Sequence, residues 1–191
     1  MAHIQLPEGQ PGIIGPLAAY PESEIHLDGL TNAVMCGPSS LTRAEREMIA
    51  TYVSSGNECY FCTQSHAAVT RQLWGEQPGV VQQVLDNCAA APIDEKLRAL
   101  LVIADKVRRD GRQVTEDDVR LARDAGADDK AIHDTVLIAA MFCMFNRYVD
   151  GLATWTPKDP AMYEEIGARI ASKGYGSRFR EAKPPVEAPQ L

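Results

Sequence analysis

The chain has 191 residues, of which 45% are hydrophobic and 24% charged, and its formal net charge is −7 at pH 7. A chain of this length fits one domain, or one domain built from two similar halves, and buries enough surface to fold without a disulfide or a metal. The acidic balance excludes a general nucleic-acid binder, which needs clustered Lys and Arg. The basic residues between Lys96 and Lys130 alternate with acids, which predicts solvated helix faces.

Hydropathy indicates no membrane segment. The longest apolar run, 136–145, has ten residues, which is too short for a bilayer and typical of a buried core helix. The opening MAHIQLPEGQPG lacks the basic-then-apolar layout of a signal peptide, so we expect a cytoplasmic protein. The five cysteines should then be reduced, and a close pair of them is more often catalytic or metal-binding than structural.

In chain order, the first 21 residues are rich in Pro and Gly and predict an extended N-terminal arm. Helical periodicity follows almost throughout, and no segment alternates apolar and polar residues at period two, so the predicted fold class is all-α. The predicted helices are 22–35, 43–53, 59–74, 80–88, 92–110, 116–126, 129–153 and 160–172. The expected division is an arm over 1–21, a helical domain over 22–172 and a C-terminal tail over 173–191.

Two capping boxes and one break support these boundaries. The capping-box spacing occurs at Thr42 with Glu45 and again at Thr115 with Asp118. In a capping box, each of the two side chains accepts a hydrogen bond from the backbone N–H of the other residue. Residues 54–58 include Gly56 and Asn57, which end the second helix before Cys59.

The stretch NECYFCTQSHA carries the candidate chemistry. If Cys59 begins a helix, Cys62 and His66 follow on the same helical face. A thiol in the first helical turn feels the positive end of the helix dipole, which lowers its pKa, and His66 can accept or carry its proton. Two cysteines at this spacing can close a disulfide with little rearrangement.

Glu47 lies twelve residues before Cys59, so a helical hairpin can return its carboxylate to His66. A Glu–His–Cys relay is a workable way to generate thiolate. Cys62 could then attack a peroxide oxygen to form a sulfenic acid, which Cys59 condenses with to give a disulfide.

The run of Glu47, Cys59, Cys62 and His66 in EREMIATYVSSGNECYFCTQSHAAV resembles the alkylhydroperoxidase D (AhpD)-like family of the carboxymuconolactone decarboxylase superfamily. The later segment from LLVIADKV to FNRYVDGL is similar to the peroxidase-related branch of that family. The resemblance spans about residues 20–155. It implies an AhpD-like helical bundle that forms homo-oligomers, either trimers or hexamers.

The same resemblance implies roles for four residues. Cys62 corresponds to the peroxide-reactive cysteine, Cys59 to the resolving cysteine, and His66 with Glu47 to the proton relay. The implied partners are a hydroperoxide substrate and a thiol or lipoyl-protein reductant, with no cofactor. One departure is that well-studied members carry a second histidine directly before the second cysteine, where this chain has Phe61, so one proton carrier is missing.

Other interpretations of these residues stay open. The cysteine pair could bind a metal or only pack, although the isolated Cys36, Cys88 and Cys143 supply no second ligand pair. The chain could instead be a protein disulfide oxidoreductase without peroxidase activity, a carboxymuconolactone decarboxylase-like enzyme, or a non-catalytic redox sensor. Asn146, within an apolar helix, indicates either a polar helix end or a contribution to the pocket or a subunit interface.

Overall fold

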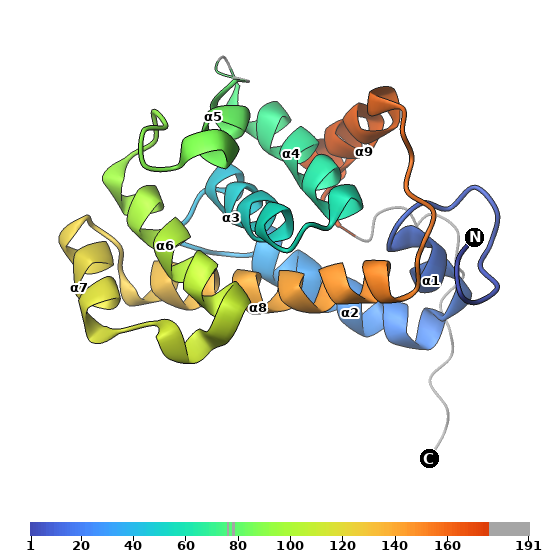
Figure 1. Cartoon of the computed structure of the whole chain (residues 1–191), viewed down its shortest axis with the longest axis horizontal. Coiled ribbons are helices and arrows are strands. Elements are labelled where there is room, and N and C mark those ends of the chain that lie inside the picture. The colour runs from blue at the N-terminus through green and yellow to red at the C-terminus, as the bar shows by residue number, and fades with distance from the viewer. Residues whose placement is uncertain (76, 78, 176–191) are drawn as a thin grey trace.

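A computed structural model describes residues 1–75, 77 and 79–175. Over these residues the chain forms α-helices and one short 3₁₀ helix, with no strand, which confirms the all-α prediction (Figure 1). The elements in chain order are α1 Ile14–Ala19, α2 Pro21–Cys36, α3 Arg43–Gly56, α4 Tyr60–Trp74, α5 Val80–Asn87, α6 Glu95–Asp110, η1 Gly111–Gln113, α7 Glu116–Asp124, α8 Asp129–Gly151 and α9 Pro160–Lys173. Among the described helices, none is long and apolar enough to cross a membrane.

The helix starts follow the predicted capping signals. Thr42 and Glu45 form a reciprocal capping box at the start of α3, and Thr115 and Asp118 form another at the start of α7. Asp128 caps α8 by accepting from the backbone N–H of Ala131 at 2.7 Å. The local sequence therefore sets where each of these helices begins.

Helix α3 lies at the centre of the fold, with α4 and α6 beside it and the long α8 crossing below in the view of Figure 1. It is buried on nearly every side, with Met48, Ile49, Ala50 and Val53 fully inaccessible. Such a helix buries more apolar area than an amphipathic surface helix. Its buried polar side chains are therefore held in fixed positions.

Helix α9 packs closely on α4 at a glycine. A Cβ placed on Gly167 would lie 2.7 Å from the Cβ of Ala68 and 3.0 Å from the backbone nitrogen of Val69. Only glycine lets the two backbones approach this closely. The contact fixes α9 against the helix that carries Cys62 and His66.

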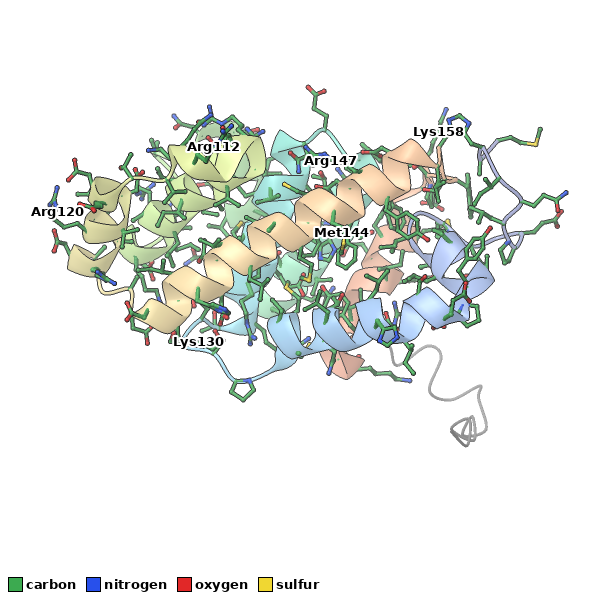
Figure 2. All side chains as sticks on the ribbon, turned by 90° about the horizontal axis from the view of Figure 1, so that it is seen from below. Arg112, Arg120, Lys130, Met144, Arg147 and Lys158 are labelled. Atoms are coloured by element: carbon green, nitrogen blue, oxygen red, sulfur yellow. The ribbon has the colours of Figure 1, made fainter. Side chains whose placement is uncertain are left out.

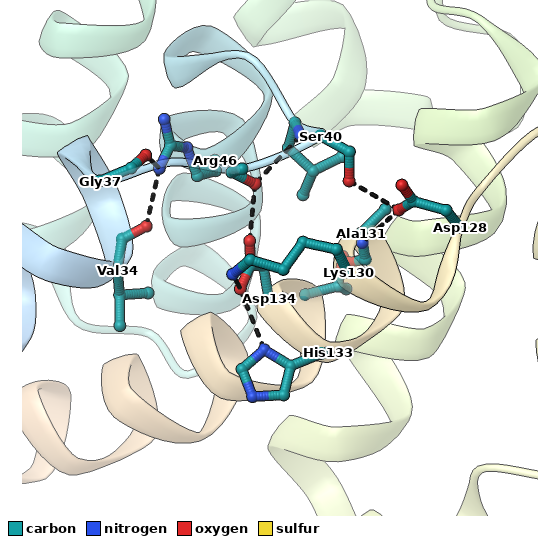
Figure 3. Close-up of polar contacts among 12 residues, drawn as sticks. Val34, Gly37, Ser40, Arg46, Asp128, Lys130, Ala131, His133 and Asp134 are labelled. Carbon is teal, nitrogen blue, oxygen red and sulfur yellow. Dashed lines mark hydrogen bonds and ion pairs between the residues drawn. The ribbon is translucent and has the colours of Figure 1, made fainter.

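A polar network fastens the loop between α2 and α3 to the start of α8 (Figure 3). Ser39 Oγ donates to Asp134 Oδ2 and Ser40 Oγ donates to Asp128 Oδ1, each at 2.6 Å. Arg46 of α3 donates to two backbone carbonyls at the end of α2, each at 2.9 Å. The network fixes the first turns of α3, from which Glu47 projects.

The basic residues between Lys96 and Lys130 all pair with acids, as the alternating pattern predicts. Figure 2 shows Arg112 and Arg120 at the α6–α7 end of the molecule, directed toward solvent. Arg120, for example, contacts Asp117 at 3.0 Å and Asp124 at 3.4 Å. These pairs form a solvated surface of mixed charge.

The N-terminal segment differs from the extended arm that its Pro and Gly content predicts. Residues 14–19 form the short helix α1, in which Ile14 and Leu17 are buried. Pro16 is tolerated because it lies in the first turn, where no intrahelical N–H bond is required. Burial of apolar side chains in the tertiary structure outweighs the weak local helix signal.

This segment also covers the start of α4. Gly12 has a left-handed backbone, φ 52°, and a Cβ added there would lie 2.1 Å from the ring of Phe61. The backbone N–H of Gly12 donates to the Trp155 carbonyl at 2.8 Å, and that of His3 donates to the Leu152 carbonyl at 2.9 Å. The segment is therefore tied down beside the cysteine pair.

We expect Gly12→Ala to lower the free energy of unfolding by about 2–4 kcal/mol, because it adds overpacking against Phe61 to the strain of a left-handed alanine. Gly9→Ala is the matched control, since Gly9 also has a positive φ, 71°, but open space around its Cβ position. It should cost about 1–2 kcal/mol. Denaturant titration of both variants measures the difference, and equal losses would show that Gly12 does not pack on Phe61 in solution.

Candidate active site

The cysteine pair lies at the turn between α3 and α4. After α3 ends, Glu58 takes a left-handed conformation, φ 61°, and the Cys59 backbone N–H donates to the Ser54 carbonyl at 3.1 Å. Cys59 is the residue just before α4 and has extended backbone angles, so only Cys62 lies within the first helical turn. The Cys59 carbonyl accepts the Thr63 N–H at 2.9 Å, which begins the helix.

The two thiols are free, nearly inaccessible and electrostatically unequal. Cys59 is 0% exposed and Cys62 is 4% exposed. The largest influence on Cys62 is a hydrogen bond from the Cys59 thiol, which lowers the pKa of Cys62. Burial acts in the opposite direction and raises this pKa. The electrostatic interaction with His66 and a hydrogen bond from the Asn146 side chain lower it further. The same thiol–thiol hydrogen bond, with burial, raises the pKa of Cys59 far above its ordinary value. Cys62 is therefore the thiol of the pair that ionises more readily, and Cys59 is the hydrogen-bond donor to it.

Glu47 and His66 form the predicted contact across the hairpin. The Glu47 carboxylate is fully buried, and its Oε2 lies 2.8 Å from His66 Nδ1. Because a carboxylate can only accept, neutral His66 carries its proton on Nδ1 and leaves Nε2 unprotonated. The imidazole ring is held in place by Phe142, whose ring centroid lies 4.5 Å away in an edge-to-face arrangement.

A small cavity of about 70 Å³ borders Cys62 and His66. Its apolar walls come from the N-terminal segment and from α1, α2, α4 and α8, and comprise Ile13, Leu17, Leu27, Phe61, Phe142 and Phe145. The polar groups on its surface are Asp28, Thr31, Cys62, His66 and Tyr175. The cavity has room for only a few water-sized molecules.

Phe61 directly precedes Cys62, at the position where the resemblance implies a second histidine. It is 4% exposed and forms part of this apolar wall. Tyr60 points away and is 54% exposed. Phe61 thus shapes the cavity and has no proton to give.

Asn146 belongs to the site. It is 1% exposed, its Nδ2 donates to Ser54 Oγ at 3.0 Å, and its Oδ1 accepts from Asn57 at 2.9 Å. Its side chain also helps to lower the pKa of Cys62, after the contributions of Cys59 and His66. Cys143, one turn before Asn146 on α8, is partly buried and accepts a hydrogen bond from Asn57 at 3.4 Å. Of the two interpretations of Asn146, the structure supports a contribution to the site.

Tyr175 is the residue that sequence reasoning misses. It follows α9, in the segment 173–191 that the sequence assigns to a tail, yet its hydroxyl donates to Glu47 Oε1 at 2.6 Å. The rest of that segment, 176–191, lies outside the described residues. The only local signal is an aromatic residue just after Gly174, the glycine that ends the helix.

In the part of the chain that the structure describes, no three His, Cys, Asp or Glu side chains come together as ligands for a metal ion. The polar groups brought together at the candidate site are the two thiols and the glutamate–histidine pair.

These features define an all-helical protein with a dithiol at the start of a buried helix and a glutamate–histidine pair behind it. The carboxymuconolactone decarboxylase family profile matches residues 21–106, which include all four residues. An uncharacterised peroxidase-related protein from Silicibacter sp. TM1040 is 33% identical, with 78% of each chain covered and a TM-score of 0.71. The chain belongs to the AhpD-like, carboxymuconolactone decarboxylase superfamily, as its motif predicts.

Two further solved structures are similar. An uncharacterised peroxidase-related protein with an alkylhydroperoxidase AhpD core, from Ralstonia eutropha JMP134, is 29% identical over 82% of this chain and 80% of its own, with a TM-score of 0.74. A protein of unknown function from Agrobacterium tumefaciens is 21% identical over 78% of this chain and 99% of its own, with a TM-score of 0.67, and shows the fold alone. No curated protein sequence matches the chain.

Proposed function

We propose that the chain is a thiol-dependent peroxidase that reduces hydrogen peroxide or small alkyl hydroperoxides through a Cys59–Cys62 dithiol–disulfide cycle. The observation that carries the proposal is the unequal dithiol: the pKa of Cys62 is lowered and that of Cys59 is raised, at a cavity that Cys62 and His66 share. A reactive thiolate next to a thiol that can resolve its oxidised form is what peroxide reduction requires.

In the first step His66 Nε2 takes the proton of Cys62, and Glu47 stabilises the imidazolium that forms. The Cys62 thiolate then attacks one peroxide oxygen. An S–O bond forms, the O–O bond breaks, and the leaving alkoxide or hydroxide takes the proton from His66. The products are a Cys62 sulfenic acid and an alcohol or water.

In the second step the Cys59 sulfur attacks Cys62 and forms the disulfide, while the hydroxyl leaves with the Cys59 proton as water. Oxidation of Cys62 removes the thiolate whose hydrogen bond raises the pKa of Cys59 most. Cys59 therefore becomes easier to deprotonate at the stage where it must react. An external dithiol then reduces the disulfide and is itself oxidised.

The reductant, proposed to be a small thiol or a lipoyl-protein, must reach sulfurs that are buried. A slender dithiol arm suits such a site better than the folded surface of a partner protein. The same burial disfavours the alternative of a general disulfide oxidoreductase, because thiol exchange with a partner protein needs an accessible sulfur. The homo-oligomer, trimer or hexamer, stays a prediction.

The test is steady-state consumption of hydrogen peroxide and of cumene hydroperoxide with dihydrolipoamide as reductant. We expect turnover of hydrogen peroxide and a much lower kcat/KM for the bulky peroxide, because the cavity is small. Leu17→Ala, which removes part of a cavity wall, should raise the cumene-to-hydrogen-peroxide ratio of kcat/KM by about tenfold. The control Leu121→Ala alters an exposed leucine of α7 and should leave the ratio unchanged.

Absence of peroxide consumption with every thiol reductant would overturn the proposal. Reduction of a protein disulfide by the same preparation would then favour the oxidoreductase alternative. Lactone decarboxylation that survives loss of both cysteines would favour the decarboxylase alternative.

A further inference from the structure

The end of α9 is fastened to the beginning of α3. Arg43, the first residue of α3, donates from Nη1 to the Ala171 carbonyl and from Nη2 to the Ile170 carbonyl, both at 2.9 Å. Carbonyls in the last turn of a helix lack a full set of intrahelical donors, and a guanidinium is well suited to them. The last turn of α9 therefore lies next to the start of α3, about one turn before Glu47, and Gly174 and Tyr175 follow from there.

Gly174 ends α9, and Tyr175 then turns back toward the hairpin. The Tyr175 ring is nearly parallel to that of His66, at an angle of 21° with centroids 6.1 Å apart, and it forms part of the cavity wall. A residue 109 positions from His66 in sequence thus lies against the face of its imidazole.

The Tyr175 hydroxyl completes the hydrogen bonding of the buried carboxylate. Glu47 Oε1 accepts from Tyr175 at 2.6 Å, while Oε2 lies 2.8 Å from His66 Nδ1. The hydroxyl oxygen is also 3.2 Å from His66 Nδ1. Burial, with the nearby charge of Glu47, raises the pKa of Tyr175 well above 10.0, so the phenol keeps its proton and acts as a donor.

We propose, on the basis of the peroxidase function above, that Tyr175 is a positioning residue of the proton relay. Its hydroxyl holds the Glu47 carboxylate so that the second oxygen faces His66 Nδ1, which leaves Nε2 of His66 to receive the proton of Cys62. A buried carboxylate oxygen that loses its donor is left without a hydrogen-bond partner, and the carboxylate is then no longer held in the orientation that faces His66 Nδ1.

Other charged and titratable groups also act on this relay. Cys59 and Asp150 face Cys62, and the latter raises the pKa of Cys62. Arg43 and Cys36 act on Tyr175, with Arg43 lowering its pKa and Cys36 raising it. Asp28 lies on the cavity surface. None of these groups is altered by a Tyr175→Phe substitution, which keeps the ring and removes only the hydroxyl.

The experiment is the pH dependence of Cys62 alkylation by iodoacetamide in the reduced full-length chain, followed by mass spectrometry of the Cys62 peptide. Tyr175→Phe should move the midpoint of the profile upward by about one pH unit and slow alkylation at pH 7 about tenfold, the usual scale for a lost hydrogen bond to a charged group. Tyr163→Phe is the matched control. Tyr163 is buried next to the thiols and interacts electrostatically with both, but its hydroxyl donates to the Pro157 carbonyl at 2.7 Å and not to Glu47, so it controls for the loss of a nearby phenol hydroxyl.

A second measurement separates positioning from general packing. In a Glu47→Gln background, Tyr175→Phe should cause no further shift, because both substitutions act through the same carboxylate. Equal midpoints for Tyr175→Phe, Tyr163→Phe and wild type, or the full shift persisting in the Glu47→Gln background, would overturn the proposal. If Tyr175→Phe does not fold, the ¹⁵N chemical shifts of His66 in the wild-type protein test the proposal instead. We expect a proton on Nδ1. A proton on Nε2 alone would overturn the proposal.

The alkylation assay contains no peroxide, so its outcome is independent of the proposed function. A shifted midpoint without peroxide turnover would retain the relay and refute the peroxidase. Peroxide turnover without a shifted midpoint would refute only the role of Tyr175.

Discussion

Cys62→Ser should abolish peroxide turnover, with a loss of about three orders of magnitude or more, as expected when a covalent nucleophile is removed. Cys59→Ser should instead stop after one turnover, with Cys62 trapped as a sulfenic acid. The reason for the difference is that the hydrogen bond between the thiols lowers the pKa of Cys62 and raises that of Cys59, so Cys62 gives up its proton more readily than Cys59.

The measurement is a thiol count by mass spectrometry after one equivalent of hydrogen peroxide. Wild type should contain a Cys59–Cys62 disulfide, and Cys59→Ser should contain a dimedone-reactive Cys62. Cys88→Ser is the control, because Cys88 is a half-buried free thiol whose pKa is raised by burial. A sulfenic acid on Cys59 in the Cys62→Ser variant would reverse the order of attack, and two reduced thiols beside unconsumed peroxide would refute the peroxidase.

His66→Gln should slow peroxide turnover at pH 7 by about 10²-fold or more, the range typical of a lost general acid–base. It should also raise the pKa of Cys62 toward its ordinary value of 9.0, since the charge of His66 is one of the influences that lower it. The thiolate is the reactive form, so the defect in alkylation should be largest at low pH and shrink as the pH approaches 9.

The pH profiles of iodoacetamide alkylation and of peroxide turnover check this expectation. Glu47→Gln should act in the same direction, because the neutral amide no longer stabilises the His66 imidazolium. His133→Gln is the control: its side chain is 63% exposed and contacts Asp134 at 3.0 Å, far along α8 from the thiols. An unchanged profile in His66→Gln would show that Cys62 loses its proton by another route.

Phe61 and Tyr175 show where this chain places apolar and hydroxyl-bearing side chains around the glutamate–histidine pair. The residue directly before Cys62 is apolar and forms a cavity wall, whereas a hydroxyl from beyond α9 contacts the glutamate–histidine pair. The hydroxyl next to the glutamate–histidine pair thus comes from a distant segment rather than from within the Cys-x-x-Cys motif.

The sequence by itself determined the helical fold class, most helix boundaries and four residues of the candidate site. Those features depend on short-range physics: caps such as Thr42 act over one turn, and the spacing from Cys59 to His66 covers two turns. The twelve-residue interval before Cys59 sufficed to bring Glu47 to His66 because the two helices are joined by a tight turn.

Only the tertiary structure decided which thiol is acidic, how large the cavity is, and that Tyr175 and the N-terminal segment belong to the site. The inequality of Cys59 and Cys62 comes from their mutual hydrogen bond, their burial and His66, none of which periodicity encodes. Tyr175 reaches Glu47 across 128 residues because α9 packs on α4 and accepts hydrogen bonds from Arg43 of α3. Such contacts depend on the packing of whole helices, so a segment that is Pro- and Gly-rich or lies near the chain end can still be fixed at the centre of the chemistry.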